Sequence, residues 1–195
     1  AAPDASLAVN AAIVAAKSYG GKVFLSAGTY WMDTPVNMDN VTQIEVAGLG
    51  GVSSSAPDFY GSHFMFRNTA DNRNAIWWSG VGMTYCHLHH FSIRAHVYRW
   101  DAGPLGGLTD NCKAGIFIAG QYNPTTLLGL ESANNVLEGL YIYVPATVGA
   151  VAMHGTSIDR IVKCHVYNIS DGLGALVLST ANGGPPNYNR LQTAR

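Results

Sequence analysis

The sequence predicts an all-β fold, a solenoid of parallel strands closed at its N-terminal end by one α-helix. Three observations lead to this prediction. Charged residues make up only 12% of the 195 residues and glycine accounts for 22 of them, a composition that favours an ordered, β-rich body. Two families of short β-like segments alternate along the chain, and an alanine-rich helical stretch precedes them. A single domain is expected over residues 1–195.

The first predicted element is a helix over residues 4–17, inside a capping segment over residues 1–19. Asp4 is expected at its N-cap, because a carboxylate there can accept the free amide hydrogens of the first turn. Spacings of four and three give one narrow apolar stripe, formed by Val9, Ile13 and Ala16. Gly20 follows where a left-handed C-cap is needed. Such a helix can cover the open end of a coiled sheet, although an ordinary helix–strand unit would give the same pattern.

The segment after the helix, residues 20–30, reads GGKVFLSAGTY. Together with the helix it resembles the start of proteins of the pectate-lyase-like superfamily, which carry the form AI-A-GG-V-PAGTY. The matching residues are Ala12, Ile13, Ala16, Gly20, Gly21, Val23, Phe24, Leu25, Ala27, Gly28, Thr29 and Tyr30. Ser26 stands in place of the usual proline. The resemblance implies a right-handed, single-stranded parallel β-helix, and it says little about the reaction.

Internal repeats support a solenoid. One family of segments starts at His87, Val136, Ile161 and Arg190, and the other starts at Ala75, Gly115, Ala150 and Ala175. Their alternation predicts two or three strands per coil, with a basic coil of about 24 residues. Residues 95–113 and 121–134 are the expected loop insertions. The chain stops at Arg195 in the middle of a repeat, so we expect it to be the N-terminal part of a longer β-helix.

Period-two alternation assigns each repeat position to the interior or to the outer face. The expected inward ladders are Leu88, Leu137, Val162 and Leu191 in one family, and Ile76, Ile116, Val151 and Leu176 in the other. The expected outward columns are His89, Glu138, Lys163 and Gln192, and Trp77, Phe117, Ala152 and Val177. The second outward column is apolar, which predicts that it packs under an insertion or against another subunit.

The candidate catalytic residues are Glu138, Asp159 and Glu131. Glu138 is expected beside Lys163, whose charge would keep the carboxylate ionised and suit it to act as a base or nucleophile. Glycoside hydrolysis needs a pair of carboxylates, and spacing alone does not select which of the three form it. A solvated polar face with a stacked ion pair is the alternative interpretation.

The candidate substrate-binding residues are Lys163, His89, Gln192, Trp77 and Trp100. Polar side chains on a flat sheet can bind sugar hydroxyls, and indole rings can stack on sugar rings. The three cysteines are expected to be small core residues. The His-rich run at 87–90 does not suggest a metal site, because alternation splits its histidines between two faces and no second Cys or His pair has zinc spacing. No metal and no cofactor are therefore expected.

These features, with the resemblance, imply a protein that binds and degrades a polysaccharide as a hydrolase or lyase. The superfamily includes phage tailspike depolymerases, which implies a homotrimer at an extracellular or virion surface such as a phage tail. The alternative is a non-catalytic structural or adhesin spike module. A net charge of −1 gives no basic footprint for nucleic acid, and no apolar run is long enough for membrane insertion.

Overall fold

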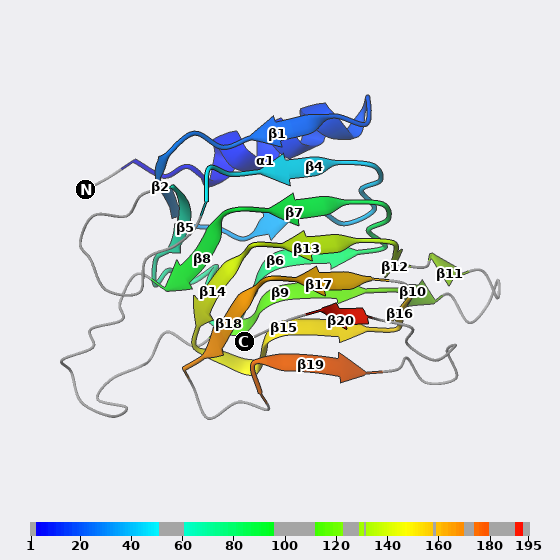
Figure 1. Ribbon diagram of the computed structural model, residues 1–195. Helices are drawn as coiled ribbons and strands as arrows, with labels where there is room; N and C mark the ends of the chain where they lie inside the picture. The colour runs from blue at the N-terminus through cyan, green and yellow to red at the C-terminus, as the bar shows by residue number, and fades with distance from the viewer. Residues whose placement is uncertain are drawn as a thin grey trace.

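The computed structural model describes residues 3–50, 61–95, 112–122, 129–130, 132–157, 159–169, 174–179 and 190–192. Within these residues the fold is mostly β with one helix, and the main strands form three parallel sheets, here called sheets A, B and C (Figure 1). Successive strands enter the sheets in the fixed order A, B, C, so each coil of the chain adds one strand to every sheet. This is the arrangement of a parallel β-solenoid.

The order of strands in each sheet follows the order of the coils. In the described part of the chain, sheet A contains β1 (Lys22–Phe24), β4 (Glu45–Ala47), β7 (His87–His89), β13 (Val136–Glu138), β17 (Arg160–Val162) and β20 (Arg190–Gln192). Sheet B contains β2 (Gly28–Met32), β5 (Ser62–Phe66), β8 (Ser92–Ala95), β14 (Tyr141–Val144) and β18 (His165–Asn168). Sheet C contains β3 (Val36–Asn37), β6 (Ile76–Val81), β9 (Cys112–Ala119), β15 (Ala146–His154) and β19 (Leu176–Ser179).

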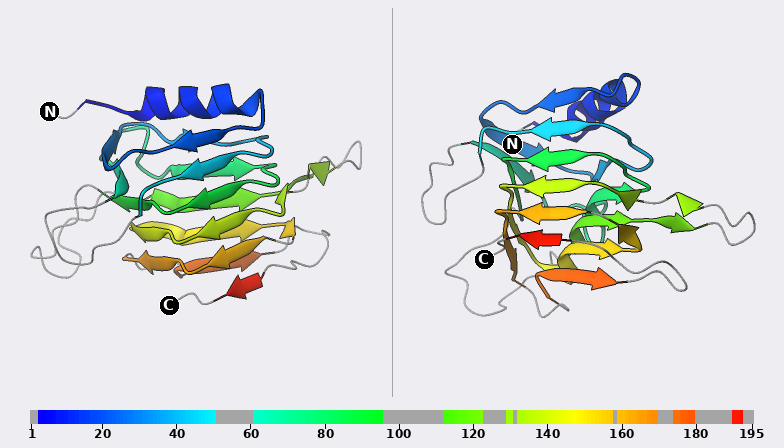
Figure 2. Two further views of the ribbon diagram at one scale, coloured as in Figure 1. Left: turned by 45° about the horizontal axis from the view of Figure 1, so that its top comes forward. Right: turned by 45° about the vertical axis from the view of Figure 1, so that its right-hand side comes forward.

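Helix α1 (Ser6–Lys17) lies across one end of the solenoid, where it contacts β1, β2 and β3, the first strands of the three sheets (Figure 2). The predicted helix is confirmed, and Val9 and Ile13 of its apolar stripe are buried. Ala5 occupies the N-cap without a side-chain bond. Asp4 supplies the acceptor from one residue earlier, since its Oδ1 accepts the amide hydrogen of Ser6 at 3.0 Å. Gly20 has φ +63°, as its predicted left-handed role requires.

The inward ladder of sheet A differs from the prediction at one residue. Its observed members are Leu88, Leu137 and Ile161, which pair in register across β7, β13 and β17. The backbone of Leu191 on β20 pairs with Ile161 in the same register. Val162 was predicted in this ladder and that prediction is wrong, because β17 begins at Arg160 and Val162 pairs with Glu138. Ile161 is therefore the buried residue of this strand.

Residues with positive φ at equivalent positions of successive coils explain why Ile161, and not Val162, faces the interior. His90, Gly139 and Lys163 follow β7, β13 and β17 with φ of +58°, +58° and +52°. Each one turns the chain from sheet A towards sheet B, and the residue after it is buried. Lys163 is thus an exposed turn residue. Its predicted place in the outward column beside Glu138 is wrong, and Val162 occupies that place.

In sheet C the predicted inward ladder is confirmed at Ile116, Val151 and Leu176, and it is wrong at Ile76. Val151 pairs with Ile116 on one side and with Leu176 on the other, as predicted. The residue above Ile116 is Trp78, two residues beyond the predicted Ile76. The outward column shifts in the same way: Phe117, Ala152 and Val177 align in register, and Ser79 stands where Trp77 was expected.

The insertion predicted over residues 121–134 contains short strands of its own in its described residues. β10 (Gln121–Tyr122) pairs antiparallel with β11 (Gly129–Leu130), and β12 (Ser132–Ala133) pairs parallel with β16 (Thr156–Ser157) of the next coil. The insertion predicted over residues 95–113 lies almost entirely outside the described residues. No helix in the described part of the chain is long and apolar enough to cross a membrane.

The interior is continuous from the helix to the last described coils. Its side chains form one cluster of aliphatic and aromatic residues in which Phe64 and Trp78 both pack against Phe91. The cysteines Cys86, Cys112 and Cys164 are free and buried within it, as the sequence predicts. Burial raises the pKa of each thiol, that of Cys112 to about 12, so these thiols stay protonated at neutral pH.

Candidate functional site

Two imidazoles and two carboxylates gather on the outer face of sheet A. This imidazole–carboxylate cluster consists of Glu45 on β4, His87 and His89 on β7, and Glu138 on β13. Glu45 pairs in register with His87, and His89 pairs in register with Glu138. Residues of three consecutive coils therefore meet because neighbouring strands lie only about 4.8 Å apart.

Direct polar contacts join the members of the cluster. The Nε2 atom of His89 lies 2.7 Å from Oε1 of Glu45, and Nε2 of His87 lies 3.0 Å from Oε2 of Glu138. The rings of His87 and His89 are 4.2 Å apart between centroids. Lys22 Nζ donates to Oε1 of Glu45 at 2.7 Å from the preceding coil. The cluster is partly open to solvent, since 34% of the Glu138 side chain and 36% of the His87 side chain are exposed.

Charge and burial adjust the protonation of this cluster. Hydrogen bonds from Lys22 and then from His89 lower the pKa of Glu45, which keeps this carboxylate ionised. Burial lowers the pKa of His87, and the neighbouring His89 lowers it further, while the hydrogen bond with Glu138 opposes the shift. His87 is therefore neutral at neutral pH. A neutral imidazole beside a carboxylate can exchange a proton with a substrate or donate a lone pair to a cation.

The structure brings only some of the predicted site residues together. Glu138 and His89 both belong to the imidazole–carboxylate cluster. Lys163 lies in the turn after β17, and Val162 takes its predicted place beside Glu138.

The other predicted residues lie away from the cluster or outside the described residues. Gln192 pairs in register with Val162 of β17, which places its backbone two strands from Glu138. Glu131 and Trp100 lie outside the described residues.

Asp159 lies inside the solenoid and does not face Glu138 across a cleft. Only 1% of its surface is exposed. Its Oδ1 accepts the backbone amide hydrogen of Asn135 at 2.8 Å and the Asn135 side-chain amide at 3.1 Å. Asn135 also donates to Oγ of Ser132, so a buried polar row crosses two coils. Burial raises the pKa of Asp159 to about 6. Its position gives it a structural role in this row.

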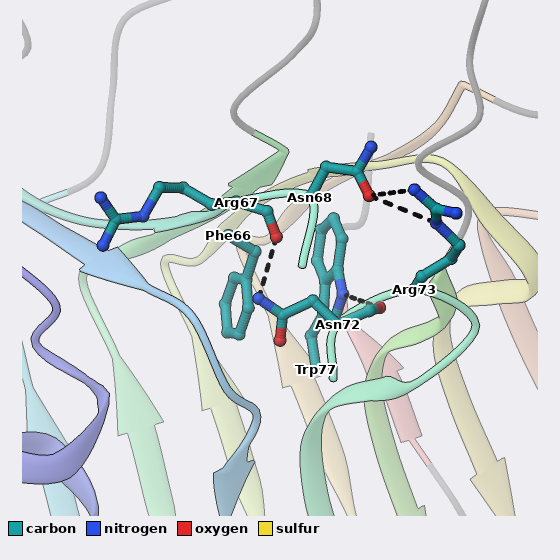
Figure 3. Close-up of a pocket in the computed structure, with 6 residues that line it drawn as sticks. All are labelled: Phe66, Arg67, Asn68, Asn72, Arg73 and Trp77. Carbon is teal, nitrogen blue, oxygen red and sulfur yellow. Dashed lines mark hydrogen bonds between the residues drawn. The ribbon is translucent and has the colours of Figure 1, made fainter. Parts of the chain in front are cut away.

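Trp77 is buried, although alternation places it on the outer face. Its ring stacks on Phe66 at 4.8 Å between centroids, and its Nε1 donates to the carbonyl oxygen of Asn72 at 2.9 Å. Figure 3 shows the shallow pocket at this place, with Arg67 and Arg73 at its sides. The turn between β5 and β6 covers the indole, which leaves 2% of Trp77 exposed and no open ring face for a sugar. The period-two alternation of side chains along β6 does not predict that the preceding turn folds back over the outer face of this strand.

A second outer face carries aromatic side chains that the sequence analysis missed. The sheet B aromatic row consists of Tyr141, Tyr143 and Tyr167, and its ring centroids are 5.7–6.3 Å apart. The Arg94 guanidinium lies 5.5 Å from the Tyr141 ring centroid and 5.7 Å from that of Tyr143. Tyr167 is 43% exposed. The alternation Tyr-Ile-Tyr-Val over residues 141–144 is the signal that could have predicted this row.

Comparisons with known proteins give no family assignment. No protein-family model, no curated protein and no solved structure matches the chain. The basis for a function is therefore the geometry of the two outer faces together with the resemblance in the N-terminal segment.

The buried carboxyl group of Asp159 predicts a specific pH dependence of stability. Its pKa is higher in the folded state than the ordinary value of 3.8, so protonation favours folding. That stabilisation is complete below about pH 4 and is lost as the pH rises through 6. Asp159→Asn keeps an oxygen for the Asn135 amide and cannot ionise. In urea denaturation, the variant should gain up to about 3 kcal/mol relative to the parent between pH 4 and pH 7.

Asp4 and Glu45 have lowered pKa values, so their contribution to stability rises with pH, and it does so equally in the parent and the variant. The difference between the two curves therefore isolates Asp159. Parallel stability curves for parent and variant from pH 4 to pH 7 would show that Asp159 has no raised pKa.

Proposed function

We propose that this chain is the polysaccharide-binding part of a right-handed β-helix protein of the pectate-lyase-like type, and that the sugar chain binds along the sheet B aromatic row. The observation that carries the proposal is the group of three tyrosine rings on neighbouring strands with Arg94 beside them. Tyrosine rings offer apolar faces to the C–H surface of a sugar and hydroxyl groups to its oxygens. Arginine adds several hydrogen-bond donors.

The placement of the row suits an extended ligand. Arg94, Tyr143 and Tyr167 pair in register on β8, β14 and β18, so they lie along the axis of the solenoid. A polymer lying in this direction would contact one coil after another and gain affinity from each coil. An isolated monosaccharide would touch only one or two of the rings. A polysaccharide is therefore the ligand class that fits this face best.

Affinity electrophoresis with bacterial capsular and plant polysaccharides tests this binding surface. Tyr143→Ala removes the ring in the centre of the row and should weaken binding about fivefold, because stacking contacts are worth on the order of 1 kcal/mol each. Tyr19→Ala is the matched control, since Tyr19 is 91% exposed and follows helix α1. Absence of binding to every polysaccharide, or equal effects of the two variants, would refute the proposal.

Degradation of the bound polysaccharide at Glu138 is the second part of the proposal. The supporting observation is the contact of 3.0 Å between Glu138 and His87 on a partly open surface. In this assignment Glu138 is the base or nucleophile, and its polar neighbour is His87 of the preceding coil, where Lys163 of the following coil was predicted. Elimination is open to such a pair, whereas hydrolysis requires a second carboxylate beside Glu138.

Glu138→Gln should lower turnover at least about a hundredfold, the usual contribution of a general acid–base group. The melting temperature should stay nearly unchanged, because Glu138 is partly exposed. Reducing ends measure both reactions, and ultraviolet absorbance of unsaturated products marks elimination alone. Asp71→Asn on an exposed turn is the control. Undiminished turnover in Glu138→Gln would place catalysis elsewhere. Binding without either signal in the parent would favour the non-catalytic spike or adhesin alternative.

The same resemblance leads us to propose a tailspike-like homotrimer at an extracellular or virion surface. Phe117, Ala152 and Val177 form an apolar column on the outer face of sheet C, which would suit a contact between subunits. Light scattering should then give three times the chain mass of 20.7 kDa. A monomer mass at micromolar concentration would contradict the trimer.

A further inference from the structure

We propose that the imidazole–carboxylate cluster binds a divalent transition-metal ion of the zinc type. One ligand atom from each of Glu45, His87 and His89 lies within 4.8 Å of the other two. Two imidazoles and one carboxylate form the donor set of many catalytic zinc sites and of the facial triads that hold iron. The site shares His87 with the residues proposed for polysaccharide degradation, but it does not rest on polysaccharide binding along the sheet B aromatic row.

Backbone pairing holds the three ligands in place. His87 and His89 are two residues apart on β7 and so share one face of the strand, while Glu45 pairs with His87 from the adjacent strand β4. The other ring nitrogen of His89 is 2.7 Å from Nδ1 of His90. A hydrogen bond of this kind orients a metal-binding imidazole and leaves its second nitrogen for the ion.

The present contacts are close to the spacing that an ion requires. Bonds of about 2.1 Å in a tetrahedral site separate the ligand atoms by roughly 3.4 Å. Glu45 Oε1 and His89 Nε2 are 2.7 Å apart and share a hydrogen, so they need to separate by less than about 1 Å. Binding then exchanges a shared proton for the ion, which is the usual chemistry of a carboxylate and an imidazole.

Glu138 adds a second carboxylate at the edge of the site. Its Oε2 lies 3.0 Å from Nε2 of His87, but it is not one of the three residues whose ligand atoms all lie within 4.8 Å of one another. Solvent can complete the coordination of the ion. The nitrogen donors select against calcium and magnesium, which prefer oxygen ligands only.

Lys22 is the group that opposes metal binding. Its Nζ lies 2.7 Å from the same oxygen of Glu45, so the ammonium repels an incoming cation and occupies one of its ligand atoms. The side chain is 49% exposed and can turn into solvent when an ion binds. Removing its charge should therefore strengthen metal binding.

Calorimetric titration of the full chain with zinc at neutral pH tests the site. We expect the parent to bind one zinc ion per chain and to melt at a higher temperature with zinc than with chelator. His87→Gln and His89→Gln should each weaken binding at least about a hundredfold, and Glu138→Gln about tenfold. His165→Gln is the matched control, because it removes one exposed histidine from sheet B, and its affinity should equal that of the parent.

Lys22→Gln keeps the proposal testable if a histidine variant fails to fold. It should bind zinc severalfold more tightly than the parent, because one unit charge close to the ion is removed. Circular dichroism of this variant must match that of the parent, since unfolding would expose the buried thiols of Cys86, Cys112 and Cys164, which also bind zinc. Cobalt should give visible absorption bands of tetrahedral coordination in the parent and lose them in His89→Gln. The proposal is overturned if the parent binds no zinc, if His87→Gln binds like His165→Gln, or if Lys22→Gln binds no more tightly than the parent.

Discussion

Parallel pairing in register is the constraint on which the rest of this structure depends. Each residue stacks on its equivalent in the next coil, so the interior is filled by ladders such as Leu88, Leu137 and Ile161. The same pairing acts on the outer faces. It carries Glu45, His87 and Glu138 from three coils into one cluster, and it aligns Arg94, Tyr143 and Tyr167 in the aromatic row. Both candidate sites are therefore consequences of the coil register.

The left-handed turn residues decide where each strand ends and thus maintain that register. A shift of one residue would move every side chain of a strand to the opposite face. His90, Gly139 and Lys163 occupy equivalent positions after sheet A, and only one of them is glycine. A lysine in this conformation is strained relative to glycine, so the stacking of neighbouring coils must outweigh its cost. The helix α1 covers the first coil, where no further strand continues the stack.

The sequence predicted those features that depend on local patterns. The capping helix follows from its stripe and Gly20, and the ladder through Val151 follows from alternation in long apolar strands. Alternation failed at Val162, because Lys163 gives no sequence signal of a left-handed turn. It failed at Trp77, where a turn covers the outer face. The imidazole–carboxylate cluster was missed because ligand-spacing rules search one segment, whereas Glu45 and His87 meet from separate coils.

Methyl contacts in sheet A test this account most directly, because they report the register itself. Nuclear Overhauser spectroscopy on a chain with labelled leucine, isoleucine and valine methyl groups can separate the two possible alignments of β17. We expect contacts from Leu137 to Leu88 and to Ile161, with Val162 on the other face. Contacts from Leu137 to Val162, with none to Ile161, would contradict the register of β17 against β13 on which this description of sheet A depends.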